Sequence, residues 1–121
     1  MSRGELFSVV HQSGECIARN VRKADTFFSR FVGLAWSGRR RSLLLEPCGS
    51  IHTIGMFYPL DIVFLDESGV ILRTLFALGP FRAAMCRHAR STLEFPSGMA
   101  PSMFLSKGEK LYLCPQNQPP E

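Results

Sequence analysis

Short apolar runs separated by turn residues recur throughout this chain of 121 residues. The clearest pair is "LDIVFLD" and "VILRTLFAL", which flank the polar, glycine-containing stretch "DESG". Strand-forming residues on both sides of such a turn predict a β-hairpin over Leu60–Leu78. "LFSVVH" and "CIARNV" flank "QSGE" in the same way and predict another hairpin near the N-terminus. Short runs repeated in this manner indicate a mainly β sandwich or barrel.

Helical spacing of apolar residues is clear in one segment. Phe27, Phe28 and Phe31 fall on one face of a helix, and Asp25 or Thr26 can cap its N-terminus. We therefore expect an α-helix near residues 26–35 that closes one end of the core. A short helical turn is expected near residues 97–105, because proline at position 101 fits best in a first turn.

The other segments complete a single compact β domain over residues 1–115. Proline, glycine and polar turn residues bound further predicted strands at 42–47, 49–56, 88–95 and 107–115. The stretch "GPFRAAMCR" between two of them is expected to be a loop. Residues 116–121, "QNQPPE", are polar and proline-rich, which predicts a frayed tail.

Composition and charge exclude several classes of protein. Apolar residues make up 45% and charged residues 20%, as in ordinary globular domains. The formal net charge is +4, and the only basic cluster in the sequence is Arg39–Arg41. Because no aromatic residues are interleaved with these arginines, we prefer a solvated loop over a specific nucleic-acid site. No apolar run reaches 18 residues, and the start lacks a secretory signal, so we expect a cytoplasmic protein with no membrane partner.

The central block is similar to a known family. "CGSIHTIGMFYPLDIVFLDESGVIL", followed by Cys86, "ARSTLEFPSGMA" and "SKGEKL", resembles the domain of unknown function 192 family. The likeness extends over roughly Ile17 to Leu113, including the predicted helix. It implies a compact, mainly β domain related to jelly-roll-like sandwiches. It also implies no established activity.

Two segments each place a cysteine and a histidine on one side of an extended chain. Cys48 and His52 are an even number of residues apart, as are Cys86 and His88, so each pair would lie on one face of a strand. If the segments meet, these four residues have the types needed for tetrahedral zinc, structural or catalytic. One alternative is a buried thiol pair, or a Cys48–Cys86 disulfide that forms on oxidation. Another is that the four residues occupy unrelated positions and have only structural roles. We expect no cofactor, with zinc as the alternative.

A cysteine enzyme is disfavoured by the same spacing. Cys48 as nucleophile would need His52 as base and Asp61 as the orienting group. Cys48 and His52 are four residues apart, which is about 13 Å along a strand and too far for ready contact. We therefore lean against an enzyme.

Three other residues complete the candidate binding site. Asp61 either accepts backbone N–H bonds that fix the turn after Pro59, which we prefer, or provides a polar group at the lip of a pocket. Thr53 follows His52, and Trp36 either packs in the core or lines a binding face. The sequence thus predicts a non-catalytic domain that binds a small molecule or a protein, with these candidate residues: Trp36, Cys48, His52, Thr53, Asp61 and Cys86.

Overall fold

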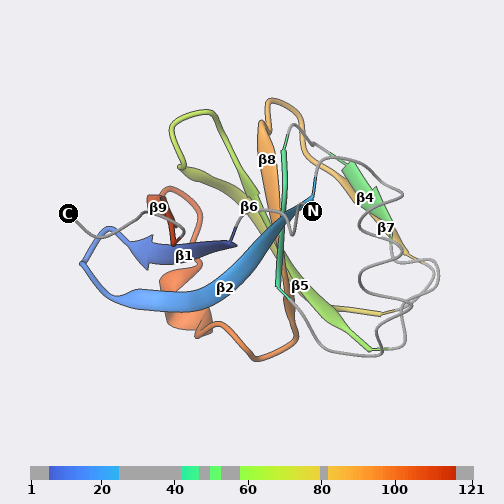
Figure 1. Cartoon of the computed structure of the whole chain (residues 1–121). Helices are drawn as coiled ribbons and strands as arrows, with labels where there is room; N and C mark the ends of the chain where they lie inside the picture. The colour runs from blue at the N-terminus through green and yellow to red at the C-terminus, as the bar shows by residue number, and fades with distance from the viewer. Residues whose placement is uncertain (1–5, 25–41, 47–49, 53–57, 80–81, 117–121) are drawn as a thin grey trace.

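The structure, a computed structural model, is mainly β, as the sequence predicts. It describes residues 6–24, 42–46, 50–52, 58–79 and 82–116 (Figure 1). None of the described helical segments has the length and apolar character needed to cross a membrane. The described elements are β1 (Leu6–His11), β2 (Cys16–Ala24), β3 (Leu43–Leu45), β4 (Ser50–His52), β5 (Leu60–Leu65), β6 (Ile71–Leu78), β7 (Ala83–Met85), β8 (Ser91–Pro96), the 3-10 helix η2 (Ser102–Phe104) and β9 (Leu111–Pro115).

Seven strands form one mixed sheet in the order β6-β5-β8-β3-β2-β1-β9. The β2–β3 pair is parallel and the other neighbours are antiparallel. β4 and β7 form a separate antiparallel pair, seen to one side of the large sheet in Figure 1. Both predicted hairpins, β1–β2 and β5–β6, are therefore confirmed.

The large sheet bends until its two ends meet at the start of β6. Val70 forms an isolated antiparallel bridge with Lys110, just before β9. The Ile71 N–H donates to the Glu109 carbonyl over 2.8 Å, and the Gly108 N–H donates to the Ile71 carbonyl over 2.8 Å. Only these few residues connect the two ends of the sheet. The architecture fits the jelly-roll-like sandwich expected from the sequence. Among the described strands, only β5 pairs with β6.

The centre of the sheet is buried on both faces. Every residue of β5 and of β8 is buried, so their alternating side chains enter two separate cores. Val63, Leu65, Leu93 and Phe95 pack with side chains of β1, β2 and β9. On the other face, the second core contains side chains of β3 and β5, with residues of β6 and of the β7 region packed against it: Leu43, Leu45, Leu60, Ile62 and Phe64, then Leu75, Leu78, Ala84 and Cys86.

The β5–β6 turn has the chemistry that its sequence predicts. Asp66 Oδ1 accepts the backbone N–H groups of Ser68 at 2.8 Å and Val70 at 2.9 Å. Gly69 has φ +88°, and a Cβ there would lie 2.5 Å from the Leu111 carbonyl oxygen. Glycine is required at this position because the strand β9 approaches the turn so closely.

The remaining predicted elements have mixed outcomes. The α-helix near 26–35 lies outside the described residues. The helical turn near 97–105 is present as η2, with Pro101 at its N-cap. The predicted loop at 79–87 is wrong in part, because residues 83–85 form β7 through pairing with β4. The strand predicted from residue 88 begins at 91, since His88, with φ 68°, belongs to a turn.

The C-terminal tail is anchored at its first residue. The Gln116 N–H donates to the Leu6 carbonyl over 2.8 Å. The Gln116 side-chain oxygen accepts hydrogen bonds from the Ser8 hydroxyl and from the Asn20 N–H, whose positive φ of 58° marks a bulge in β2. Gln116, expected in the frayed tail, thus joins β1, β2 and the end of β9.

Candidate functional site

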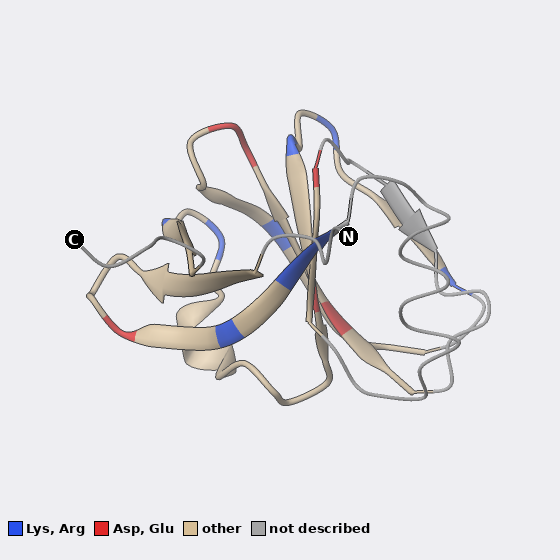
Figure 2. Ribbon diagram, viewed as in Figure 1, with Lys and Arg blue, Asp and Glu red and all other residues tan. Residues whose placement is uncertain are grey.

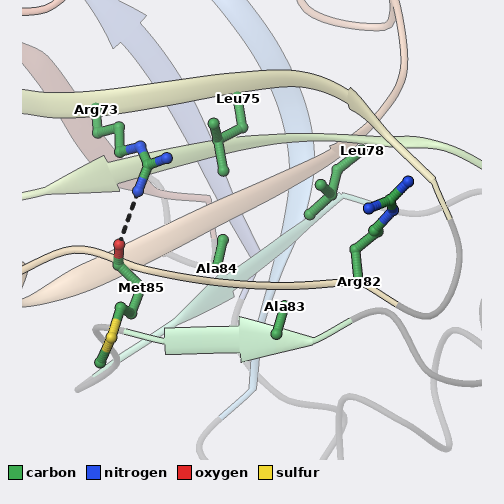
Figure 3. Close-up of a pocket in the computed structure, with 7 residues that line it drawn as sticks. All are labelled: Arg73, Leu75, Leu78, Arg82, Ala83, Ala84 and Met85. Atoms are coloured by element: carbon green, nitrogen blue, oxygen red, sulfur yellow. Dashed lines mark hydrogen bonds between the residues drawn. The ribbon is translucent and has the colours of Figure 1, made fainter.

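An apolar groove of about 690 Å³ lies between β6 and β7. Leu75 and Leu78 of β6 face Ala84 of β7 across it (Figure 3). Met85 also borders the groove, but its side chain, 70% accessible, points away from β6 in Figure 3. The β6–β7 groove, as we name it, is lined by Arg73, Leu75, Leu78, Arg82, Ala83, Ala84 and Met85.

Two arginines flank this groove. Figure 3 shows Arg73 and Arg82 at its opposite ends, with the leucines between them. Arg73 Nη1 donates to the Met85 carbonyl oxygen over 3.0 Å, which connects β6 to β7. The exposed Arg82 precedes β7 directly. The groove therefore combines an apolar floor with a positive charge at each end.

A second groove, of about 670 Å³, lies on the other side of β6. Thr74 and Phe76 line it, while Leu75 between them lines the β6–β7 groove, as expected from strand alternation. The Thr74 hydroxyl donates to the Leu105 carbonyl over 2.8 Å, which holds the segment after η2 against β6. We call this the β6–η2 groove; its lining residues are Leu72, Arg73, Thr74, Phe76, Cys86, Ser102, Leu105, Ser106 and Lys107.

Both grooves are positive in character. Among the described residues, the charged side chains that line them are Arg73, Arg82 and Lys107, with no Asp or Glu. Figure 2 shows no acidic residue on β6 or β7, whereas acidic residues occur in the β1–β2 and β5–β6 turns and within β5 and β8. Cationic side chains beside apolar surface favour a ligand that carries negative charge on an apolar body.

Asp61 fixes the backbone behind the β6–β7 groove. Its side chain is buried, with the residue 3% exposed. Oδ1 accepts the Ala77 N–H at 2.8 Å, and Oδ2 accepts the Gly98 N–H at 3.0 Å. Asp61 thus accepts backbone hydrogen bonds, as we preferred, but from β6 and the turn after β8. It does not line either of the two grooves.

The strand that contains His52 does pair with the segment before Cys86. Ser50 lies opposite Met85, and His52 lies opposite Ala83. Along β7, Ala83 precedes Cys86 by three residues, which is about 10 Å of extended chain. The strand pairing by itself therefore does not bring His52 to Cys86.

The remaining candidates fall into two groups. Trp36, Cys48, Thr53 and the side chain of His52 lie outside the part of the chain that the structure describes. Cys86 is partly buried, with its thiol 3.6 Å from the Arg87 carbonyl, and His88 is exposed. Among the described side chains, no three His, Cys, Asp or Glu residues gather where they could hold a metal ion. The binding and zinc assignments of these residues stay predictions.

Sequence reasoning missed the two arginines of the β6–β7 groove. Arg73 is the one charged residue in the apolar run "VILRTLFAL", and Arg82 stands in a stretch expected to be a loop. The available signal was a single cation within an apolar strand. Such a charge is typical of a strand at the edge of a sheet, where it discourages pairing with other chains.

The fold and these grooves define a small β-sandwich domain with a basic, apolar groove beside its terminal strand. The sequence model of the DUF192 family, described as "Uncharacterized ACR", matches residues 8–113. The chain belongs to this family, which confirms the resemblance seen in the sequence. Comparison with curated proteins finds no match.

Two solved structures have a similar fold. A protein of unknown function from Novosphingobium aromaticivorans DSM 12444 has a TM-score of 0.71 and 17% identity, covering 88% of this chain and 83% of its own. A putative transcription regulator from Sinorhizobium meliloti 1021 has a TM-score of 0.72 and 19% identity, covering 90% of this chain and 92% of its own. At these identities the likeness establishes the fold alone.

Proposed function

We propose that this domain is a non-catalytic binding module that takes an anionic, partly apolar ligand or protein segment in the β6–β7 groove. The observation behind the proposal is the pair Arg73 and Arg82 at the ends of a groove with an apolar floor, where none of the described lining residues is acidic. Burial of ligand surface against Leu75 and Leu78 supplies affinity at about 25 cal/mol per Å² of apolar area. The arginines supply orientation through charge-assisted hydrogen bonds.

A fluorescent apolar anion, 8-anilinonaphthalene-1-sulfonate, tests this proposal. We expect saturable binding by the folded protein, and about tenfold weaker binding by Arg82→Gln, as loss of one charge-assisted bond implies. Arg19→Gln is the matched control, because Arg19 is exposed on β2, with β5, β8 and β3 between it and β6. Equal thermal unfolding midpoints exclude partial unfolding as the source of fluorescence. Equal affinity of all three proteins would overturn the proposal.

A thiol or zinc site is the second candidate function. The pairing of Ser50 with Met85 favours it, because these residues lie within two positions of Cys48 and Cys86. Metal analysis of protein purified without chelator, together with a count of free thiols, tests it. Stoichiometric zinc with two protected thiols would support the site, and its absence would leave the binding module alone.

A cytoplasmic location remains part of the proposal. In the described part of the chain, Cys16, Cys86 and Cys114 are not joined in a disulfide, so the fold there does not depend on an oxidising compartment. Fractionation of cells that express the full-length protein tests the location, and recovery with the membrane or the medium would contradict it.

A further inference from the structure

Within the described part of the chain, the outer edge of β6 is covered only at its start. β6 is the terminal strand of the seven-stranded sheet, and the chain around Lys110 covers its edge only at Val70 and Ile71. Beyond Ile71, no strand of the described chain pairs with that edge. Backbone groups at such an edge can pair with an added strand.

The two grooves lie where the side chains of an added strand would go. Residues of β6 alternate between them, with Leu75 on one side and Thr74 and Phe76 on the other. A strand paired with β6 would alternate in the same way, so its successive side chains would enter the β6–β7 groove and the β6–η2 groove in turn. Both contain apolar side chains, Leu75 and Leu78 in the β6–β7 groove and Phe76, 51% accessible, in the β6–η2 groove.

The positive charge of the grooves favours an added strand that carries acidic side chains. Arg73 lines both grooves, Arg82 lines one and Lys107 lines the other. Since the described lining residues include these cations and no carboxylate, a basic segment would be repelled and an acidic one attracted. Acidic residues beside apolar ones would satisfy both the cations and the groove floors.

We infer that the open edge of β6 binds an extended, acidic segment of a partner protein, which adds to the sheet as a further antiparallel or parallel strand. This inference rests on the proposed function, since it assigns an occupant to the β6–β7 groove. Main-chain hydrogen bonds to β6 provide part of the affinity, and the alternating side chains in the two grooves provide selectivity.

The test starts from a display library of random nine-residue segments selected on the folded full-length protein. We expect enriched segments to place Asp or Glu beside alternating apolar residues, and the best synthetic peptide to bind the charge-reversed variant Lys107→Glu at least tenfold more weakly. Arg19→Glu is the matched control and should bind as the unsubstituted protein does. No enrichment, or enrichment without acidic residues, overturns the inference.

Backbone methylation separates strand addition from occupancy of the groove alone. Two versions of the same peptide are made, one N-methylated at the odd-numbered residues and one at the even-numbered residues. Each version keeps its side chains but loses the main-chain N–H donors along one edge. We expect one version to lose at least tenfold in affinity, and the parent peptide to protect amides of β6 between Leu72 and Leu78 from hydrogen exchange. Undiminished binding by both versions would overturn strand addition while leaving the proposed function intact. Failure of the sulfonate probe to bind would instead count against the proposed function itself.

Discussion

The carboxylate of Asp61 on β5 holds the backbone of Ala77 on β6 in a left-handed conformation. The Ala77 N–H donates to Asp61 Oδ1 over 2.8 Å, and Ala77 has φ 54°. This conformation is unfavourable for a residue with a Cβ, so the hydrogen bond offsets a local cost. Ala77 lies next to Leu78, which lines the β6–β7 groove. Asp61 therefore stabilises the backbone that shapes one end of the groove.

Asp61→Asn should destabilise the protein by about 1.5–3 kcal/mol, the typical value for a lost hydrogen bond to a charged group. An amide provides one oxygen acceptor, so either the Ala77 or the Gly98 N–H loses its partner. Urea unfolding measures the change. Glu67→Gln, at an exposed turn position, is the control and should change stability by less than about 0.5 kcal/mol. Equal effects of the two substitutions would contradict this role of Asp61.

Two glycines with similar backbone angles separate conformational cost from steric crowding. Gly69 and Gly108 have φ values of +88° and +92°, but only Gly69 faces a neighbour, the Leu111 carbonyl oxygen, at 2.5 Å from an added Cβ. We expect Gly108→Ala to cost about 1–2 kcal/mol for the left-handed conformation alone. Gly69→Ala should cost about 1–3 kcal/mol more, because β9 must move away from the turn. Equal losses in chemical denaturation would mean that the close approach carries no energy.

His11 joins the β1–β2 hairpin to the segment before β9. Its Nε2 lies 2.8 Å from Glu109 Oε1, its Nδ1 lies 2.9 Å from Ser13 Oγ, and its ring packs 4.9 Å from the ring of Phe104. His11→Ala should therefore cost about 2–3 kcal/mol. Ser13→Ala removes the contact of the hydroxyl with His11 and the long hydrogen bond that it accepts from the Glu15 N–H, and should cost about 0.5–1.5 kcal/mol. A reversed order of the two in thermal unfolding would contradict the joining role of His11.

Mild oxidation should connect Cys48 to Cys86 in preference to the other cysteines. Ser50, two residues after Cys48 in the sequence, pairs with Met85, the neighbour of Cys86, whereas Cys16 and Cys114 belong to β2 and β9. A bridge requires Cα atoms within about 7 Å. Peptide mapping after oxidation measures the pairing, and Cys86→Ser is the control that should abolish it. The prediction assumes that the pairing of β4 with β7 continues beyond Ser50 and Met85. A bridge from Cys86 to Cys16 or to Cys114 would contradict that assumption.

Local sequence signals predicted the hairpins but not the grooves between distant strands. The β5–β6 hairpin follows from "DESG", whose Asp66 and Gly69 act within the turn itself. β7 has the sequence Ala-Ala-Met, which has weak strand propensity, and it becomes a strand through pairing with β4. Tertiary pairing of this kind leaves no periodicity to find in three residues.

The candidate site shows the same division. That Asp61 accepts backbone bonds could be expected from the cost of burying a carboxylate among apolar residues. Its partners could not, since Ala77 and Gly98 lie 16 and 37 residues away in the chain. Arg73 and Arg82 become a pair only when β7 lies beside β6, and this arrangement depends on how the second sheet packs on the core.

The most direct test of the proposed binding module is a nuclear magnetic resonance titration of the ¹⁵N-labelled protein with 8-anilinonaphthalene-1-sulfonate. If the β6–β7 groove is the binding site, the largest amide shifts will fall in β6 and β7, around Arg73, Leu75 and Ala84, and will shrink in the Arg82→Gln protein. Shifts spread evenly over β1, β2 and β9, or equal shifts in both proteins, would contradict the account.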